Sequence, residues 1–200
     1  MASKLELINS ALILIGDLPL ESLTGNTKAH TVVNALYDNI VQTELSKFPW
    51  GFASRQVQLL RHVDQGNNPI NPLFDFSAGY LLPSDLLRLT RLSPNQKYKI
   101  YGEPESPETS RSQIVAVNYT DDLYCEYVCN VDENEWPAYF SKMVEYALAM
   151  EFAPAIRDSA SSMQLMAQQY LNASRMARYT DSQQHPQTPI QDRPFINVRF

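Results

Sequence analysis

The sequence predicts an α+β fold in which a helical bundle, formed by an N-terminal and a C-terminal helix pair, carries an inserted antiparallel β domain and ends in an extended C-terminal arm. Apolar residues recur at helical spacing near both ends of the chain, whereas they alternate with polar residues in the middle. The region after residue 180 is polar and rich in Gln and Pro. We therefore divide the chain into residues 1–52, 53–131, 132–179 and 180–200.

The first two helices are predicted by their ends as well as by their period. Ser3 and Glu6 form a capping box ahead of the first apolar series, and Gly16 stands where a left-handed C-cap belongs, which predicts a helix over residues 4–16. A longer apolar series stops at Pro49. Because proline cannot continue a helix, this series predicts a second helix of about five turns.

The middle of the chain changes to a period of two from residue 53 onward. The longest candidate strand runs from Phe74 to Leu82 and is expected to be half-buried, with Gly79 on its polar side. Shorter candidate strands follow at residues 87–92, 98–101, 113–119 and 123–129. Several short strands separated by turns predict an antiparallel sheet or a small sandwich.

The helical period returns after the acidic cluster at residues 132–135, which is placed to meet the positive end of a helix dipole. The third helix is expected to be interrupted at Pro154, and the fourth to begin near Ser159. Neither helix pair could bury its apolar face alone, so we expect the two pairs to pack together.

The C-terminal arm contains four Gln and three Pro between Asp181 and Pro194 and almost no apolar residue, so it cannot offset its own ordering entropy by folding alone. At its tip, Ile196, Val198 and Phe200 would share one face of a strand that has no partner nearby in the sequence. Such an arm is suited to reach a neighbouring chain by strand addition.

The net charge of −6 is unevenly distributed. Residues 101–151 carry 2 basic and 11 acidic residues (−9), whereas residues 55–100 and 152–200 are positive at +3 and +2. No segment has the clustered Lys and Arg of a sequence-independent nucleic-acid binder. The chain also lacks an apolar run long enough for a membrane span or a signal peptide, so we expect it to fold in a cytoplasm-like compartment.

The histidines and cysteines do not predict a catalytic, cofactor or metal site. His30, His62 and His185 match no metal-binding spacing, and we interpret them as solvated. Cys125 and Cys129 on one strand would have Cα atoms about 13 Å apart, too far for a disulfide. We expect both to be reduced, buried and apolar in character.

Other candidate groups have simpler interpretations. The carboxylates at residues 103–108, 121–122 and 132–133 match no calcium loop, so we favour a solvated or electrostatic face over metal binding. No nucleophile-elbow, dinucleotide or Walker A motif is present. The aromatic cluster at residues 48–52 is either an exposed docking patch or, as we favour, a buried plug between the helical and β regions.

The order of several segments resembles the tail tubular protein A family, the head–tail adaptors of short-tailed bacteriophages. The segments that carry the resemblance are Leu7–Leu12, Ile15–Leu23, Tyr37–Asp38, Phe48–Ala53, Tyr80–Arg88 and Tyr127–Pro137. The resemblance implies a helical bundle combined with a β-rich domain. It also implies a non-enzymatic virion protein of the tail and portal vertex, made in the host cytoplasm, that forms a homo-oligomer ring, usually of twelve subunits.

In such a ring one side attaches to the portal protein, the other side receives the tail nozzle protein, and viral DNA passes through without sequence-specific binding. Family members commonly hold the portal with an extended C-terminal segment, which corresponds here to residues 187–200. The resemblance thus implies a role in binding the portal or a neighbouring subunit for Phe195, Ile196, Val198 and Phe200. We expect part of the acidic residues 101–151 to face the channel, because a lumen lined by cations would hold phosphate.

Two other functions remain open on the sequence. The first is a monomeric accessory protein whose β domain binds carbohydrate or peptide, with stacking faces from Tyr80, Tyr98, Tyr101, Tyr119, Tyr124 and Tyr127. The second is an enzyme that acts through an unrecognised carboxylate pair.

Overall fold

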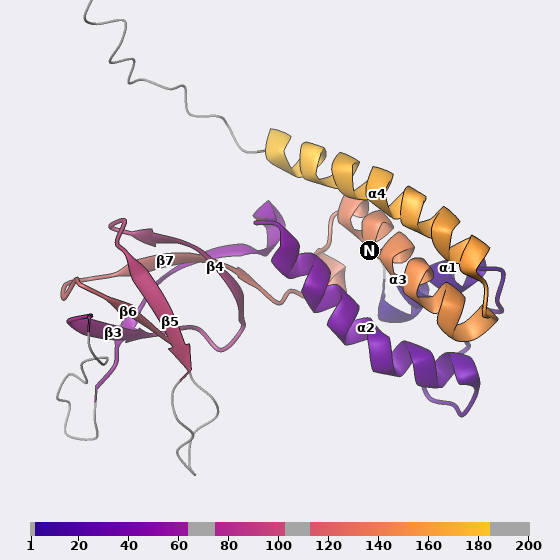
Figure 1. Cartoon of the computed structure of the whole chain (residues 1–200), viewed down its shortest axis with the longest axis horizontal. Helices are drawn as coiled ribbons and strands as arrows, with labels where there is room; N and C mark the ends of the chain where they lie inside the picture. The colour runs from indigo at the N-terminus through magenta and orange to yellow at the C-terminus, as the bar shows by residue number, and fades with distance from the viewer. Residues whose placement is uncertain (1–2, 64–74, 103–112, 185–200) are drawn as a thin grey trace, which may run out of the picture.

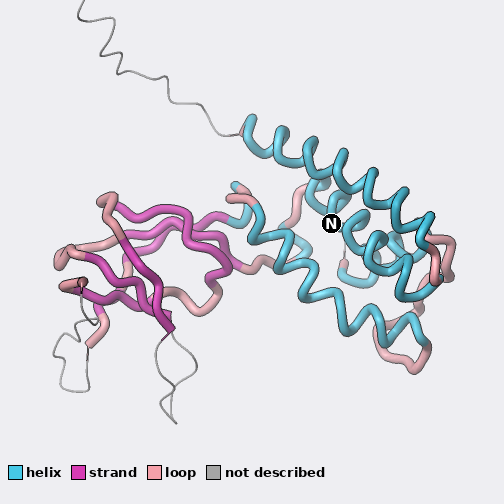
Figure 2. Tube along the Cα trace, in the orientation of Figure 1, coloured by secondary structure: helices cyan, strands magenta, loops and turns pink. Residues whose placement is uncertain are grey.

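The computed structural model of the chain describes residues 3–63, 75–102 and 113–184. Within these ranges, four α-helices and two antiparallel sheets follow one another as two helices, seven strands and two helices. Figure 1 shows the helices gathered at one end of the molecule and the strands at the other, and the colouring of Figure 2 separates the two regions. The α+β fold expected from the sequence is therefore confirmed.

The N-terminal helices begin as their sequences predict. In α1 (Lys4–Leu14), the backbone N–H of Glu6 donates to Ser3 Oγ at 3.3 Å, and the Glu6 carboxylate accepts from the Ser3 backbone N–H at 2.7 Å. Gly16 follows the helix with a φ of +76°, which a glycine adopts without strain. The second helix, α2 (Lys28–Lys47), ends just before the aromatic cluster at residues 48–52.

The expected interruption of the third helix is wrong, because α3 (Ala138–Arg157) runs through Pro154. A proline in the last turn of a helix removes one hydrogen bond, to the carbonyl four residues earlier. Pro154 is exposed, so that carbonyl can bond water instead. The adjacent Phe152 and Ala153 are fully buried and hold the last turn against the core.

The last helix, α4 (Ala160–Gln183), begins after the expected N-cap Ser159, whose Oγ accepts from the backbone N–H of Ser162 at 3.3 Å. The helix ends at Gln183, so its last turn occupies the first positions of the expected arm. The remainder of that arm, residues 185–200, lies outside the described residues. Among the helices, α3 is central and packs against α1, α2 and α4.

The strands form two antiparallel sheets. One sheet has the order β1-β7-β4 and consists of β1 (Ser54–Gln58), β7 (Tyr124–Cys129) and β4 (Leu86–Ser93). The other has the order β2-β3-β6-β5 and consists of β2 (Leu60–Arg61), β3 (Ala78–Leu81), β6 (Gln113–Val117) and β5 (Tyr98–Gly102). Four of these strands, β4 to β7, match the shorter candidates to within two residues at each end.

Two differences concern the first strands. The sequence did not predict β1 or β2, because these edge strands expose most of their side chains and so show no clear alternation of buried and exposed positions. The strand expected from Phe74 to Leu82 is shorter, and its first residue lies outside the described residues. The expectation that Gly79 faces solvent is wrong: it is buried in β3, between β2 and β6, opposite the fully buried Ala116.

Candidate assembly site at the end of the last helix

The aromatic cluster at residues 48–52 lies at the junction between the helical and β regions, with Trp50 buried and Phe48 and Phe52 partly buried against the core. Trp50 is 1% exposed, and its ring centroid lies 5.0 Å from that of Phe48 and 5.0 Å from that of Phe140 on α3. Its indole N–H donates to the backbone carbonyl of Glu44 at 3.0 Å. The interpretation as a plug between the two regions is thus confirmed, and the docking-patch alternative does not fit this burial.

A buried carboxylate attaches the end of α4 to this junction. Asp181 is 1% exposed, and both of its carboxylate oxygens lie 3.2 Å from the backbone N of Gly51. The hydroxyl of Tyr139, on α3, donates to the same carboxylate at 2.9 Å. Burial, together with the hydrogen bond and the negative charge of Asp181, raises the pKa of Tyr139, so the phenol stays protonated and able to donate.

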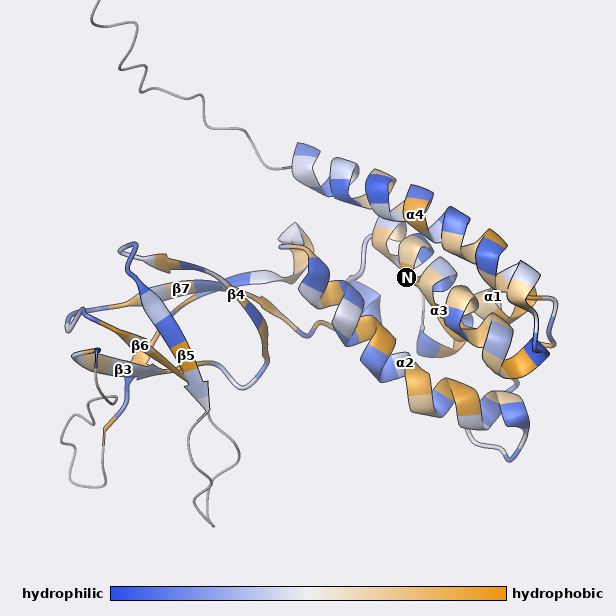
Figure 3. Cartoon of the chain, viewed as in Figure 1, coloured by the Kyte–Doolittle hydropathy of each residue, from blue (hydrophilic) through white to orange (hydrophobic). Residues whose placement is uncertain are grey.

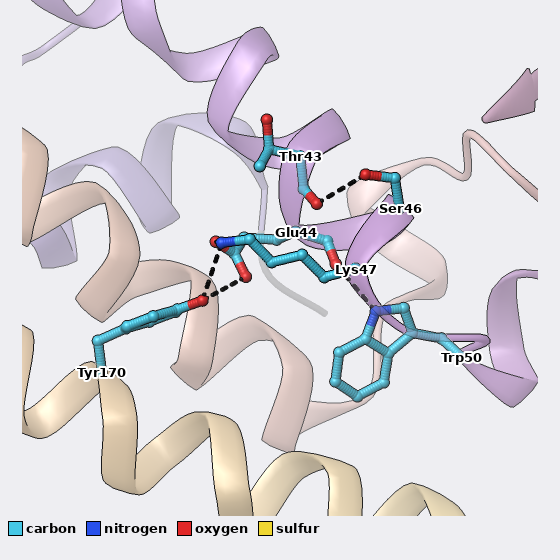
Figure 4. A network of polar contacts seen from close by, with 6 residues as sticks. All are labelled: Thr43, Glu44, Ser46, Lys47, Trp50 and Tyr170. Atoms are coloured by element: carbon cyan, nitrogen blue, oxygen red, sulfur yellow. Dashed lines mark hydrogen bonds and ion pairs between the residues drawn. The ribbon is translucent and has the colours of Figure 1, made fainter. Parts of the chain in front are cut away.

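A second buried carboxylate attaches the middle of α4 to α2 (Figure 4). Glu44 is 4% exposed; it forms an ion pair with Lys47 and accepts a hydrogen bond from the Tyr170 hydroxyl at 2.8 Å. Lys47 also donates to the Tyr170 hydroxyl at 3.1 Å. Burial alone would lower the pKa of Lys47, but its hydrogen bonds to Glu44 and Tyr170 outweigh that effect and raise it. The three groups therefore satisfy one another across the contact between the helices.

These two attachments fix α4 at its middle and at its end, beside the junction of the helical and β regions. The residues after position 184 continue from this fixed end. The expected binding residues of the arm, Phe195, Ile196, Val198 and Phe200, lie outside the described residues. The structure thus shows how the helix that leads into the arm is attached to the fold, through contacts that were not predicted from the sequence.

A local signal for both carboxylates was nevertheless present. Asp181 lies four residues after Ala177, at the next position of the apolar stripe of α4, and Glu44 lies three residues after Val41 in the stripe of α2. An acidic residue that continues an apolar stripe is expected to be buried and to need donors from elsewhere in the fold.

The described histidines form hydrogen bonds within the fold, and the two cysteines are buried in it. His30 lies in the first turn of α2, and its ring nitrogens are hydrogen-bonded to the segment before the helix, to Thr27 Oγ1 at 2.6 Å and to the backbone carbonyl of Ser22 at 3.2 Å. His62 donates its backbone N–H to Gly79, and His185 lies outside the described residues. Cys125 and Cys129 are free and buried on β7, as expected, and burial raises the pKa of Cys125 to about 11. In the described part of the chain, no group of three or more His, Cys, Asp and Glu could hold a metal ion.

The described acidic residues of the segment 101–151 lie in several parts of the fold. Asp121 and Asp122 precede β7, whereas Asp132 and the short 3-10 helix η2 (Glu133–Glu135) connect β7 to α3. Others are paired, such as Glu126 with Arg91 at 3.1 Å. The excess negative charge of these residues therefore belongs to separate surfaces of the described fold.

The six tyrosines considered for ligand stacking do not share one environment. Tyr80 and Tyr127 are buried, and the Tyr80 hydroxyl donates to the backbone carbonyl of Asp121 at 2.7 Å. Tyr98 and Tyr124 are exposed but lie on strands of different sheets. This arrangement weakens the carbohydrate-binding alternative.

None of the helices in the described ranges is long and apolar enough to cross a membrane. A comparison of the chain with protein-family models and with curated proteins found no match.

Proposed function

We propose that the protein is a structural subunit of a bacteriophage head–tail adaptor, which forms a ring between the portal protein and the tail nozzle protein and lines part of the channel for DNA ejection. The proposal rests on the collinear resemblance of the sequence to the tail tubular protein A family. The α+β fold, with a helix pair before and after the strands, agrees with what that resemblance implies.

The observation that carries the proposal furthest is the attachment of α4 through Asp181. An arm that holds a portal is pulled by its partner, and it must transmit this mechanical load to the folded part of its own subunit. Here the last turn before the arm is bonded to Gly51 at the junction and to Tyr139 on α3. A load on the arm would therefore pass to α3 and to the segment just before β1 instead of unwinding the end of α4.

The charge distribution along the chain supports a channel whose lining is acidic and not basic. In the proposed ring, part of the acidic segment 101–151 lines the lumen, because repeated cations around a channel would bind phosphate and slow the DNA. The acidic pair Asp121 and Asp122, exposed before β7, is the described candidate for this lining. A lumen lined chiefly by Arg and Lys in an assembled ring would contradict this part of the proposal.

Deletion of residues 187–200 tests the role of the arm. We expect the truncated chain to keep its circular dichroism spectrum and unfolding midpoint, because the attachment at Asp181 remains, and to lose binding to purified portal in co-sedimentation. A matched variant that keeps the length of the arm but replaces Phe195, Ile196, Val198 and Phe200 by serine should show the same loss.

Portal binding equal to that of the full chain would refute the proposed role of the arm. A wild-type chain that stays monomeric with and without portal, and that binds a sugar or a peptide, would instead support the accessory-protein alternative.

A further inference from the structure

The outward face of α4 exposes three large apolar side chains among polar ones such as Gln168 and Gln169. Leu165, Met176 and Tyr179 are 52%, 62% and 60% exposed, and their spacing places them on one side of the helix together with the exposed Asn172. This side is opposite the buried stripe that includes Met166 and packs on α3. Figure 3 shows hydrophobic, orange segments at intervals along α4, which lies along the edge of the helical region.

The composition of α4 indicates a protein partner. Residues 160–183 contain no Lys and no Glu, and their single acidic residue, Asp181, is buried. The exposed charges are those of Arg175 and Arg178. Depletion of Lys and Glu together with enrichment of Met, Tyr and Arg is typical of the centre of protein–protein interfaces. A solvated helix face would instead be dominated by charged residues.

The chain carries a complementary surface elsewhere. Asp132 and Glu133 lie before α3 and line, with Asp38 of α2 and Trp136, a hollow of about 200 Å³. Asp38 is paired with Lys4 at 2.7 Å, and Glu135 follows Glu133 in the short helix η2, outside the lining of the hollow. Asp132 and Glu135 are exposed and have no ion-pair partner among the described residues. Arg175 likewise has none in the described ranges.

The two surfaces belong to different sides of the helical region. The Tyr37 hydroxyl of α2 donates to Glu133 at 3.0 Å, which places the acidic surface beside α2, and α3 packs against both α2 and α4. Figure 1 shows α3 between α2 and α4 over much of its length. A contact between unlike surfaces of two copies is heterologous, and such contacts form a closed ring when the rotation between neighbours closes and an open filament when it does not.

We infer that the outward face of α4 binds the acidic surface beside α2 of a second copy of this chain. Arg175 pairs with the carboxylates of Asp132 and Glu135 on the neighbour, and the neighbour covers Leu165, Met176 and Tyr179 beside this pair. The inference deepens the proposed function, on which it rests, by naming the contact between neighbouring subunits.

Sedimentation velocity of the full chain over a wide range of concentrations at low salt tests this contact, because exposed ion pairs are screened by salt. We expect the wild type to self-associate. Arg175→Glu, Met176→Glu and Glu135→Arg should each weaken the association by about tenfold or more, since truncating or reversing a central contact costs one to several kcal/mol. Lys97→Glu, an equal charge change on an exposed lysine far in sequence from both surfaces, should have no effect.

Combining the two charge reversals gives the decisive measurement. Arg175→Glu and Glu135→Arg in the same chain should restore association towards that of the wild type, because each reversed charge again faces an opposite charge. The inference is overturned if the wild type is monomeric at every concentration, if Arg175→Glu and Met176→Glu associate like the wild type, or if the double reversal is no better than either single variant.

Portal binding is measured separately and distinguishes the two proposals. A wild type that associates through α4 without binding portal contradicts the adaptor function and leaves the α4 contact in place. A chain that binds portal and forms rings, and whose α4 variants associate normally, supports the adaptor function and overturns the α4 contact.

Discussion

Replacement of Asp181 by alanine should destabilise the protein strongly, although the residue lies in the last turn of the last helix. Its carboxylate is the acceptor for two donors from distant parts of the chain, the Gly51 backbone N–H and the Tyr139 hydroxyl. The substitution leaves both donors without this acceptor in a site where the carboxylate itself is 1% exposed. Terminal helix residues usually fray and contribute little, so a large effect here would be specific to the attachment.

The magnitude follows from the two lost bonds. Each hydrogen bond to a charged acceptor contributes about 1.5–3 kcal/mol, and an unsatisfied buried donor costs about 1–3 kcal/mol. We therefore expect Asp181→Ala to lower the free energy of unfolding by about 4 kcal/mol. For a chain of this size that corresponds to roughly 8–16 °C in Tm. Asp181→Asn, which keeps one acceptor oxygen, should cost about half as much.

Urea unfolding followed by circular dichroism and by Trp fluorescence measures this loss. Asp122→Ala is the matched control, because Asp122 is exposed and accepts one side-chain hydrogen bond, from Gln58 at 3.0 Å; its effect should stay within about 0.5 kcal/mol. A double-mutant cycle with Tyr139→Phe should give a coupling of about 1 kcal/mol or more. If Asp181→Ala unfolds at the same urea concentration as the control, the attachment does not stabilise the fold and the reasoning fails.

Two further predictions concern ionisation. Because the folded state raises the pKa of Tyr139, the stability that depends on its protonated form is present below the unfolded value of about 10 and is lost as the pH rises above it. Urea midpoints should therefore fall with pH above about 10 in the wild type and fall less steeply in Tyr139→Phe; equal slopes would contradict the assignment. For the thiols, a pKa of about 11 at Cys125 implies a much smaller thiolate fraction at pH 8 in the folded chain than in urea, so we expect it to react with Ellman's reagent at least about tenfold more slowly when folded. Rapid labelling of Cys125 in the folded protein, followed in a Cys129→Ala variant, would show that its burial is not maintained in solution.

The elements that could be predicted from the sequence are those whose defining residues lie within the element itself or directly beside it. Ser3, Glu6 and Ser159 act as helix caps as expected, because each cap is satisfied within three residues along the chain. The strands β4, β6 and β7 each contribute buried side chains to the core, whereas β5 is exposed along most of its length and is indicated by its aromatic and β-branched residues. By contrast, the side chains of β1 and β2 show no alternation of apolar and polar residues. These two segments are strands because their backbones pair with β7 and β3.

The candidate site could be predicted only in part, for a related reason. The alternation of Ile196, Val198 and Phe200 predicts an arm that can add a strand to a neighbouring chain. This prediction does not depend on the fold of the rest of the chain. The attachment of the arm joins residues 130 positions apart, and no local pattern relates Gly51 to Asp181. Pro154 shows the converse: a strong local signal for a helix end is overridden by the burial of Phe152 and Ala153.

The central position of α3 has a consequence for the order in which the protein folds on the ribosome. The apolar faces of α1 and α2 pack against α3, whose first residue is made about 90 residues after the end of α2. At roughly 5–20 residues per second, those faces wait about 5 to 18 seconds for the first residue of their partner, while the described strands are being synthesised. The helical region is therefore completed last, although it contains the first residues made, and the nascent chain presents two uncovered amphipathic helices to chaperones throughout that interval.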